Sequence, residues 1–136
     1  MDTWRLIVDP PLPGACNMAR DHAILDLYPH TQQPTLRLYR WSPPCVSLGQ
    51  AQRWARDVDH DACRTLGFDV VRRPTGGRAI LHQHEVTYAV IVGLDHPVVE
   101  RSGVVRSYRA ISTALQAGLA ELGIRSAFEP QGPRRS

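Results

Sequence analysis

The segment over residues 70–90, VVRRPTGGRAILHQHEVTYAV, places cationic side chains and a glycine pair between two apolar runs. Glycine accepts positive φ and carries no side chain, so the backbone N–H groups of Gly76 and Gly77 can approach a ligand closely. Successive turn amides form a concave anion site. Arg73 and Arg78 flank the turn, and a guanidinium binds a carboxylate or phosphate through two hydrogen bonds. The spacing therefore indicates an anion-binding turn, with a plain Gly-Gly hairpin as the alternative.

His82 follows Arg78 by four residues and can reach the same turn. There it could donate a hydrogen bond to a developing oxyanion or orient a carbonyl group, with a structural histidine as the alternative. His84 and Glu85 extend the pattern to H-x-H-E, but no third ligand is evident, so we predict no metal site. The turn lacks the G-K-S/T end of a Walker loop and the G-x-G-x-x-G of a dinucleotide turn.

Short strands and helices must hold this turn in place. Apolar runs predict strands over 4–9, 36–41, 68–72, 79–81, 86–92 and 124–128, with a short apolar piece at 46–49. Helical spacing predicts helices over 17–28, 57–66 and 104–122, where Asp57 or Asp59 caps the second. Prolines end the first strand at residue 10 and the first helix at residue 29. The predicted fold class is α+β, a mixed or antiparallel sheet with helices packed on it. The predicted inner face of the first helix carries Met18, His22 and Leu25.

Composition limits the classes of function. The 136 residues suffice for one domain, and no apolar run approaches the ~20 residues needed to cross a bilayer. All sixteen basic residues are arginine, so this chain alone performs no chemistry that needs a lysine amine. The arginines are spread along the sequence, which argues against nucleic-acid binding. The first residues lack a cationic lead-in, so we expect a cytoplasmic protein. Three cysteines without CxxC spacing indicate neither a disulfide framework nor zinc.

Four segments together resemble the lipoate–protein ligase and octanoyltransferase superfamily, which shares its fold with biotin–protein ligases. They are CNMARDHAIL, LRLYRWSPPCVSLGQAQ, RRPTGGRAILHQHEVTYAV and SYRAISTALQAGLAELGI, and they cover nearly the whole chain in the family's order. Arg78 stands where ligases usually have a third glycine, and EVTY follows downstream. That variant is more similar to the octanoyltransferases that take their acyl group from acyl carrier protein.

The resemblance implies a set of substrate-binding positions. The glycine turn would hold the acyl carbonyl and its activating group, and Gly49 and Gln50 would border the pocket. Trp41 would wall the acyl tunnel, with a plain core aromatic as the alternative. Thr87 and Tyr88 would line the pocket floor. The implied positions are Trp41, Gly49, Gln50, Arg73, Thr75, Gly76, Gly77, Arg78, Ala79, His82, Thr87 and Tyr88.

The implied reaction moves an octanoyl or lipoyl group toward a lysine of a lipoyl-type carrier domain. The donor would be acyl carrier protein or free lipoate, and the acceptor a lipoyl domain or a glycine-cleavage H-type protein. No tightly bound cofactor is implied, and ATP is used only by the ligase type. His82 would lie beside the reacting thioester or mixed anhydride and is the only catalytic candidate. Asp21 and His22 are expected to serve helix–sheet packing instead.

The family's catalytic lysine or cysteine belongs to a second half that has no counterpart here. We therefore expect residues 1–128 to be the N-terminal part of a catalytic domain, with 129–136 as a loop tail. We also expect the chain alone to be inactive. We favour a fragment of a longer transferase. One subunit of a split enzyme completed by a second chain and a non-catalytic acyl-binding remnant are the alternatives. Cys45, near the expected pocket mouth, is the one cysteine to test as a nucleophile.

Overall fold

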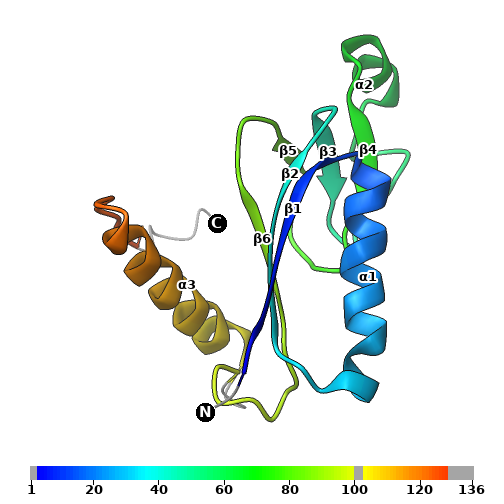
Figure 1. Cartoon of the computed structure of the whole chain (residues 1–136). Helices are drawn as coiled ribbons and strands as arrows, with labels where there is room; N and C mark the ends of the chain where they lie inside the picture. Colours follow the sequence, from blue (N-terminus) through cyan, green and yellow to red (C-terminus); the bar gives the residue numbers. More distant parts are fainter. Residues whose placement is uncertain (1–2, 100–102, 129–136) are drawn as a thin grey trace, which may run out of the picture. The chain divides into compact units, whose positions relative to one another are not determined.

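The computed structural model describes residues 3–99 and 103–128, and the chain divides into two compact units, Met1–Val92 and Gly93–Ser136. Its class is α+β with mixed sheets, as predicted. Among the described residues, no helix has both the length and the apolar character needed to span a membrane. The elements are β1 (Arg5–Leu12), α1 (Gly14–Thr31), β2 (Thr35–Trp41), β3 (Cys45–Leu48), α2 (His60–Leu66), β4 (Asp69–Arg72), β5 (Ile80–His82), β6 (Thr87–Ile91) and, in the second unit, α3 (Val104–Glu121) (Figure 1).

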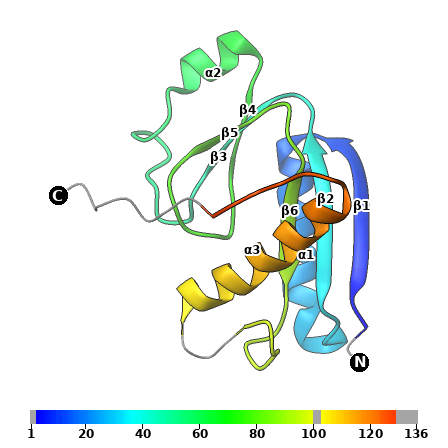
Figure 2. The ribbon, with the colours of Figure 1, turned by 90° about the vertical axis from the view of Figure 1, so that its left-hand side faces the viewer.

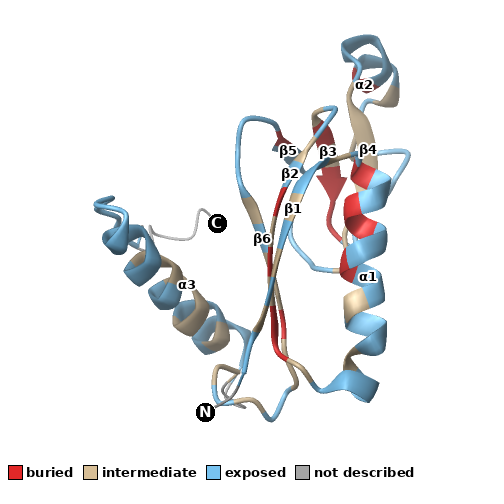
Figure 3. Ribbon diagram, viewed as in Figure 1, coloured by how far each residue is buried: buried red, intermediate tan, exposed pale blue. Residues whose placement is uncertain are grey.

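The first sheet of the first unit has the strand order β1-β2-β6, with β1 parallel and β6 antiparallel to the central β2. Helix α1 covers one face of this sheet (Figure 2). Because side chains alternate along a strand, Arg37 and Tyr39 face α1 and are buried. Leu36 and Leu38 lie on the opposite face and are only half-buried. The core of this layer therefore lies between α1 and β2, where the buried residues gather (Figure 3).

The contact between α1 and its sheet is made largely by polar groups. The fully buried Arg37 guanidinium donates to carboxylate oxygens of Asp9 and Asp21, each at 2.7 Å, and to the Asn17 side-chain oxygen at 2.7 Å. The Tyr39 hydroxyl donates to the second oxygen of Asp21 at 3.0 Å. Burial, followed by the charge of Asp21, raises the pKa of Tyr39. Every buried charge in this cluster has an opposite charge beside it, as burial requires.

This cluster also explains why the predicted inner face of α1 is confirmed at Met18 but wrong at His22 and Leu25. The buried positions of the helix are Gly14, Asn17, Met18 and Asp21, whereas His22 and Leu25 are exposed. Arg37 draws the side chains of Asn17 and Asp21 inward, so these hydrogen bonds set the rotation of the helix. The expected packing role of Asp21 is confirmed, and that of His22 is not.

The second sheet has the order β4-β3-β5, with β4 parallel and β5 antiparallel to β3. It is joined to α1 by Asp69 of β4, whose carboxylate accepts a hydrogen bond from the backbone N–H of Gly14 at 2.9 Å. A Cβ on Gly14 would lie 2.6 Å from the Cys45 sulfur, so only glycine allows the helix to begin this close to β3. The start of α1 is thereby fixed against the sheet that carries the glycine turn.

Several predicted boundaries shift in the structure. Strand β1 continues through Pro10 and Pro11 to residue 12, because it is an edge strand that pairs only with β2. Helix α1 starts at residue 14 and passes Pro29 before ending at residue 31. Helix α2 starts at residue 60, and the Asp59 carboxylate caps it by accepting from the Ala62 N–H at 3.0 Å. Gly67 ends it with φ of 70°, as its position predicted.

In the second unit, residues 124–128 form no strand, so that prediction is wrong. The amide of Ile124 donates to the Leu119 carbonyl at 2.9 Å, and the Gln116 side chain donates to the Ser126 carbonyl. These bonds turn the segment back along α3 and use groups that a strand would need for pairing. Helix α3 itself matches its prediction. The expected loop tail at 129–136 lies outside the described residues.

Candidate functional site

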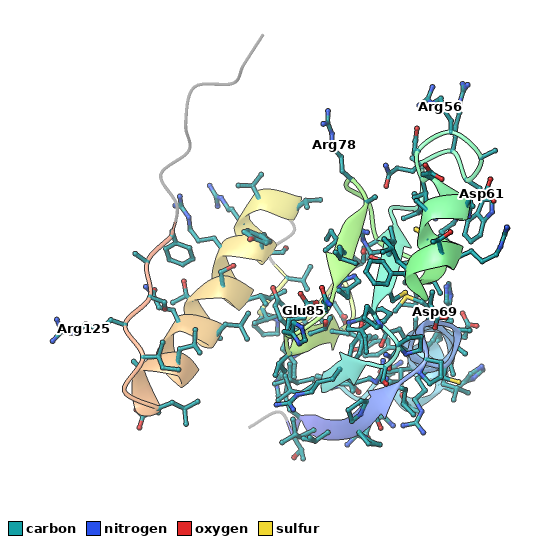
Figure 4. All side chains as sticks on the ribbon, turned by 90° about the horizontal axis from the view of Figure 1, so that it is seen from above. Arg56, Asp61, Asp69, Arg78, Glu85 and Arg125 are labelled. Carbon is teal, nitrogen blue, oxygen red and sulfur yellow. The ribbon has the colours of Figure 1, made fainter. Side chains whose placement is uncertain are left out.

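The loop between β4 and β5, residues 73–79, contains the glycine pair and is called the glycine loop below. Thr75, Gly76, Gly77 and Arg78 are exposed, and Gly77 has φ of 93°, a conformation that favours glycine. Within the described part of the chain, the backbone N–H groups of residues 75–79 donate no hydrogen bond. The Arg78 side chain extends from the tip of the loop (Figure 4). Unpaired amides and one extended cation therefore lie together on an exposed turn.

Arg73 holds the glycine loop from beneath. One terminal nitrogen of its guanidinium donates to the carbonyl and the hydroxyl of Ser47, at 2.8 and 3.0 Å. The other donates to the carbonyls of Gly76 and Arg78, both at 2.8 Å. Burial lowers the pKa of Arg73. The sequence predicted that Arg73 would grip an anion together with Arg78, but both terminal nitrogens are engaged by the protein, so Arg73 shapes the loop.

Arg72 holds a second turn, residues 49–52, beside the glycine loop. One of its terminal nitrogens donates to the carbonyls of Gly49, Gln50 and Gln52 at 2.8–3.0 Å. The Gln52 side chain accepts from the Gly49 N–H, and the Gln50 N–H donates to the Thr75 carbonyl at 2.9 Å. The two turns are thus hydrogen-bonded to each other. The predicted neighbourhood of Gly49, Gln50 and the glycine loop is present, while the part played by Arg72 was not anticipated.

His82 lies under the glycine loop at the end of β5 and is only 6% exposed. Its Nε2 is 2.7 Å from the Ser47 Oγ, and its Nδ1 is 2.5 Å from a Glu85 carboxylate oxygen. Its ring stacks on Trp41, with centroids 4.3 Å apart and planes inclined by 13°. Both ring nitrogens therefore have partners within the protein. The predicted direct donation from His82 to an oxyanion would need one of these bonds to break.

Thr87 connects Trp41 to the same group of side chains. Its hydroxyl accepts from the Trp41 indole N–H at 2.7 Å and donates to the Glu85 carboxylate at 2.8 Å. Figure 4 labels Glu85. We call the connected residues the His82 array; its members are Trp41, Ser47, Arg73, His82, Glu85 and Thr87.

The array contains four predicted site residues and two that sequence reasoning did not assign. Glu85 follows His82 by three residues, but the sequence placed it only in the H-x-H-E pattern, for which no third metal ligand was evident. Ser47 carried none, because its place beside His82 depends on the pairing of β3 with β5. Among the described residues, no group of three or more acidic, cysteine or histidine side chains is arranged to hold a metal ion.

Tyr88, Ala79 and Cys45 are the remaining candidates, and Cys45 stands directly opposite His82 in the pairing of β3 with β5. Tyr88 pairs with Leu38 on the face of the first sheet opposite α1, so alternation separates it from Thr87. Ala79 ends the glycine loop before β5 and is half-buried. Cys45 is fully buried against Gly14, and burial, with the Asp69 charge second, raises the pKa of its thiol to about 12. A buried thiol with this pKa is not an activated nucleophile, so Cys45 does not fill the role suggested for it.

Comparison with known proteins places these features in a family context. A family model described as the lipoyl protein ligase A/B catalytic domain matches residues 13–135. The octanoyltransferase LipM of Clostridioides difficile (strain 630) is 43% identical over 137 residues, which cover 100% of this chain and 50% of the relative. The chain spans about half the length of the curated relatives it matches.

Solved structures agree with this match. A protein of Thermoplasma acidophilum with bound lipoic acid superposes with a TM-score of 0.75 and 26% identity, covering 92% of this chain and 50% of that one. Lipoate-protein ligase A bound with ATP gives a TM-score of 0.74 and 28% identity, and the match covers 92% of this chain and 49% of the ligase. A bi-partite lipoate protein ligase of T. acidophilum, studied with its E2 lipoyl domain, gives a TM-score of 0.75 and 26% identity, and the match covers 96% of this chain and 49% of that one.

Proposed function

The chain belongs to the family of lipoyl protein ligase A/B catalytic domains, and on this premise we propose that it takes part in lipoate-pathway acyl transfer in the cytoplasm. Residues 1–128 hold an octanoyl or lipoyl group that is moved toward a lysine of a carrier domain. The donor is acyl carrier protein or free lipoate. The acceptor is a lipoyl domain or a glycine-cleavage H-type protein. Identity to octanoyltransferases above 40% favours the octanoyl group.

The observation that carries this proposal is the state of the glycine loop. The amides of residues 75–79 have no acceptor within the described chain, yet two arginines hold the loop and the neighbouring turn in place. A donor that is unpaired and preorganised is suited to an oxygen atom that gains negative charge. The acyl carbonyl oxygen is such an atom when a nucleophile adds to the carbonyl carbon.

Arg78 supplies the charge that Arg73 does not. It is exposed, and its side chain extends from the tip of the loop, so it can approach the activating group of the acyl donor. In an acyl-carrier substrate that group is a thioester, and in a ligase it is a mixed anhydride with a phosphate. A guanidinium binds phosphate oxygens through two parallel hydrogen bonds and stays charged at any physiological pH.

The attacking groups are proposed to come from outside this chain. The sequence contains no lysine, and Cys45 is closed off and held as a thiol. A second polypeptide segment would then provide the nucleophile, and the chain itself would bind and orient the acyl group. A split ATP-dependent ligase is the second candidate, favoured by the likeness to a ligase structure that holds ATP. A non-catalytic acyl-binding remnant is the third.

The proposal is tested by titrating the purified chain with octanoic acid in a calorimeter. We expect saturable binding by the natural sequence and none by Gly77→Val. Valine at this position would have to adopt φ near 93°, and its Cβ would lie 3.1 Å from the Arg73 guanidinium. Gly67→Val is the matched control, because φ is 70° there and no atom lies within 4 Å. Equal octanoate binding by both variants would show that the glycine loop is not the site.

A second assay tests whether the chain alone catalyses acyl transfer, with or without ATP. The chain is incubated with octanoyl acyl carrier protein and a lipoyl domain, or with lipoate, ATP and the same domain, and the acceptor is weighed by mass spectrometry. We expect no acyl transfer in either mixture. Transfer from acyl carrier protein by the chain alone would refute an external nucleophile. ATP-dependent modification would establish the ligase alternative instead.

A further inference from the structure

The hydrogen bonds of the His82 array have a defined polarity. The Glu85 carboxylate can only accept, so His82 donates to it from Nδ1. The Arg73 guanidinium can only donate, so the Ser47 Oγ accepts from it at 3.0 Å. The Ser47 hydroxyl has one hydrogen to give, and the His82 Nε2 lies 2.7 Å away as its acceptor. The pattern therefore places the imidazole proton on Nδ1.

This connectivity resembles a serine–histidine–carboxylate triad, but Ser47 is unsuited to nucleophilic attack. It is 0% exposed, so a substrate carbonyl carbon has no access to it. Its Oγ also receives a hydrogen bond from a cationic guanidinium, which holds electron density away from an attacking lone pair. Nor does His82 have a ring nitrogen left for a substrate, since each is bonded within the array.

What Ser47 does have is contact with both His82 and the residue that shapes the glycine loop. Its carbonyl and hydroxyl bind one terminal nitrogen of Arg73, and the other terminal nitrogen of Arg73 binds the Gly76 and Arg78 carbonyls. A continuous set of bonds thus leads from Glu85 through His82, Ser47 and Arg73 to the loop. Carbonyls fixed on one side of the loop leave its amides directed to the other.

We propose that Glu85 and Ser47 are positioning residues for acyl binding. Glu85 fixes the orientation and the tautomer of His82, and Ser47 couples His82 to Arg73 and so to the glycine loop. His82 then acts through Ser47 and Arg73, and donates no proton to the acyl group. The link to acyl binding rests on the proposed function, whereas the tautomer and the coupling to the loop can be measured without any ligand.

The first readout is the tautomer of His82 in the full chain, from ¹⁵N–¹H correlation spectra of the imidazole. We expect a protonated Nδ1 and an unprotonated Nε2 in the natural sequence and in Glu85→Gln, whose amide oxygen still accepts. Glu85→Ala should release the ring to a mixture of tautomers. Glu85 is partly exposed, with a side chain 40% accessible, so these variants test the idea without emptying a core position.

The second readout is the coupling to the glycine loop, from the backbone amide shifts of Gly76 and Gly77. Ser47→Ala removes the hydroxyl that joins His82 to Arg73 and should move both shifts. The same variant should weaken octanoate binding about tenfold, because the loss of one hydrogen bond that positions the loop corresponds to roughly this change in affinity. Cys45→Ala is the matched control, because it also removes one buried heavy atom from β3 but breaks no bond of the array.

The results separate this inference from the proposed function. An Nδ1 proton with glycine shifts that respond to Ser47→Ala supports the positioning array even if octanoate does not bind, in which case only the proposed function fails. A proton found on Nε2 in the natural sequence would overturn the inference. So would octanoate binding that is equally tight in Ser47→Ala and Cys45→Ala. If Ser47→Ala does not fold, the comparison of Glu85→Ala with Glu85→Gln decides between the same outcomes.

Discussion

Replacing Gly49 by alanine is the most direct test of how the two turns support each other. A Cβ built on Gly49 would lie 2.9 Å from the carbonyl carbon of Gly77 and 3.2 Å from that of Gly76, and closer still to the Gly77 oxygen. Ordinary van der Waals contact begins at 3.4 Å. The glycine loop must therefore move away by more than 0.5 Å where Gly77 meets Gly49, because the Gly77 oxygen is closer than its carbonyl carbon. The neighbour is backbone, which cannot swing aside as a flexible side chain does.

The size of the effect follows from the bonds that this retreat strains. The Gln50 N–H to Thr75 carbonyl bond and the two Arg73 bonds to loop carbonyls all cross or flank the contact. Overpacking a tight contact costs about 1–3 kcal/mol. The loop is exposed at residues 75–78, so part of the strain is relieved by movement into solvent. We expect Gly49→Ala to lower the free energy of unfolding by about 1–2 kcal/mol and to abolish octanoate binding.

Gly76→Ala is the matched control, because a Cβ there meets no atom within 4 Å and the residue does not have positive φ. Urea unfolding followed by circular dichroism gives the free energy, and calorimetric titration gives the octanoate affinity. Gly76→Ala should change the free energy of unfolding by less than about 0.5 kcal/mol. Gly76 belongs to the proposed site, so Gly76→Ala serves as the control for stability only, and the affinity of Gly49→Ala is compared with that of the natural sequence. The reasoning is refuted if Gly49→Ala and Gly76→Ala have the same free energy of unfolding.

Three further predictions concern the scaffold. Arg37→Met should lower the free energy of unfolding by about 3–5 kcal/mol, because it leaves the Asp21 carboxylate buried without a cation and leaves Asp9 with only the exposed Arg20. Arg40→Met, at an exposed position, should change it by less than about 0.5 kcal/mol, and equal urea midpoints would contradict this. Asp69→Ala should lower the free energy of unfolding by about 1 kcal/mol, because the Gly14 N–H at the start of α1 loses its acceptor. Asp61→Ala, which removes an exposed ion pair, should lower it by at most about 0.5 kcal/mol. The reverse order in urea unfolding would disprove the cap. The pKa of Cys45 is about 12 in the folded chain and near 9 in the unfolded chain, so raising the pH between these values favours the unfolded state. Between pH 8 and pH 10.5 the free energy of unfolding should therefore fall less in Cys45→Ala than in the natural sequence. An equal fall in both proteins would exclude the effect.

The local signals in the sequence were strong enough to predict most elements but not the faces they bury. Gly67 predicted the end of α2, and Asp59 was one of the two candidate caps for its start, because the chemistry of these residues acts within a few positions. The inner face of α1 could not be read in the same way. Its position depends on Arg37, sixteen residues beyond Asp21 and twenty beyond Asn17, and a charged residue in a half-apolar strand is ordinarily assigned to solvent.

In the candidate site, too, the residues with local signals were predicted and those that depend on long-range contacts were not. The glycine pair and His82 stood out because glycine and histidine are informative residue types, whereas Gly49 was implied by the family resemblance. Ser47 and Glu85 gain their meaning only from the pairing of β3 with β5 and from the path of the chain after β5. Arg73 was predicted to lie at the glycine loop and to bind an anion, but it binds the loop's own carbonyls. Spacing cannot distinguish a guanidinium that faces a ligand from one that faces the backbone of its own chain.

The neighbouring positions Arg72 and Arg73 serve two different turns, because consecutive side chains at the end of β4 leave on opposite sides. Deleting a single residue from β4 would exchange these directions, and each guanidinium would then meet the wrong carbonyls. The number of residues in β4 is therefore constrained, as well as the residue types at positions 72 and 73. A lysine pair at these positions would satisfy the charge but not the geometry, since an ammonium group lacks the two separated terminal nitrogens with which Arg73 spans Ser47 and the loop.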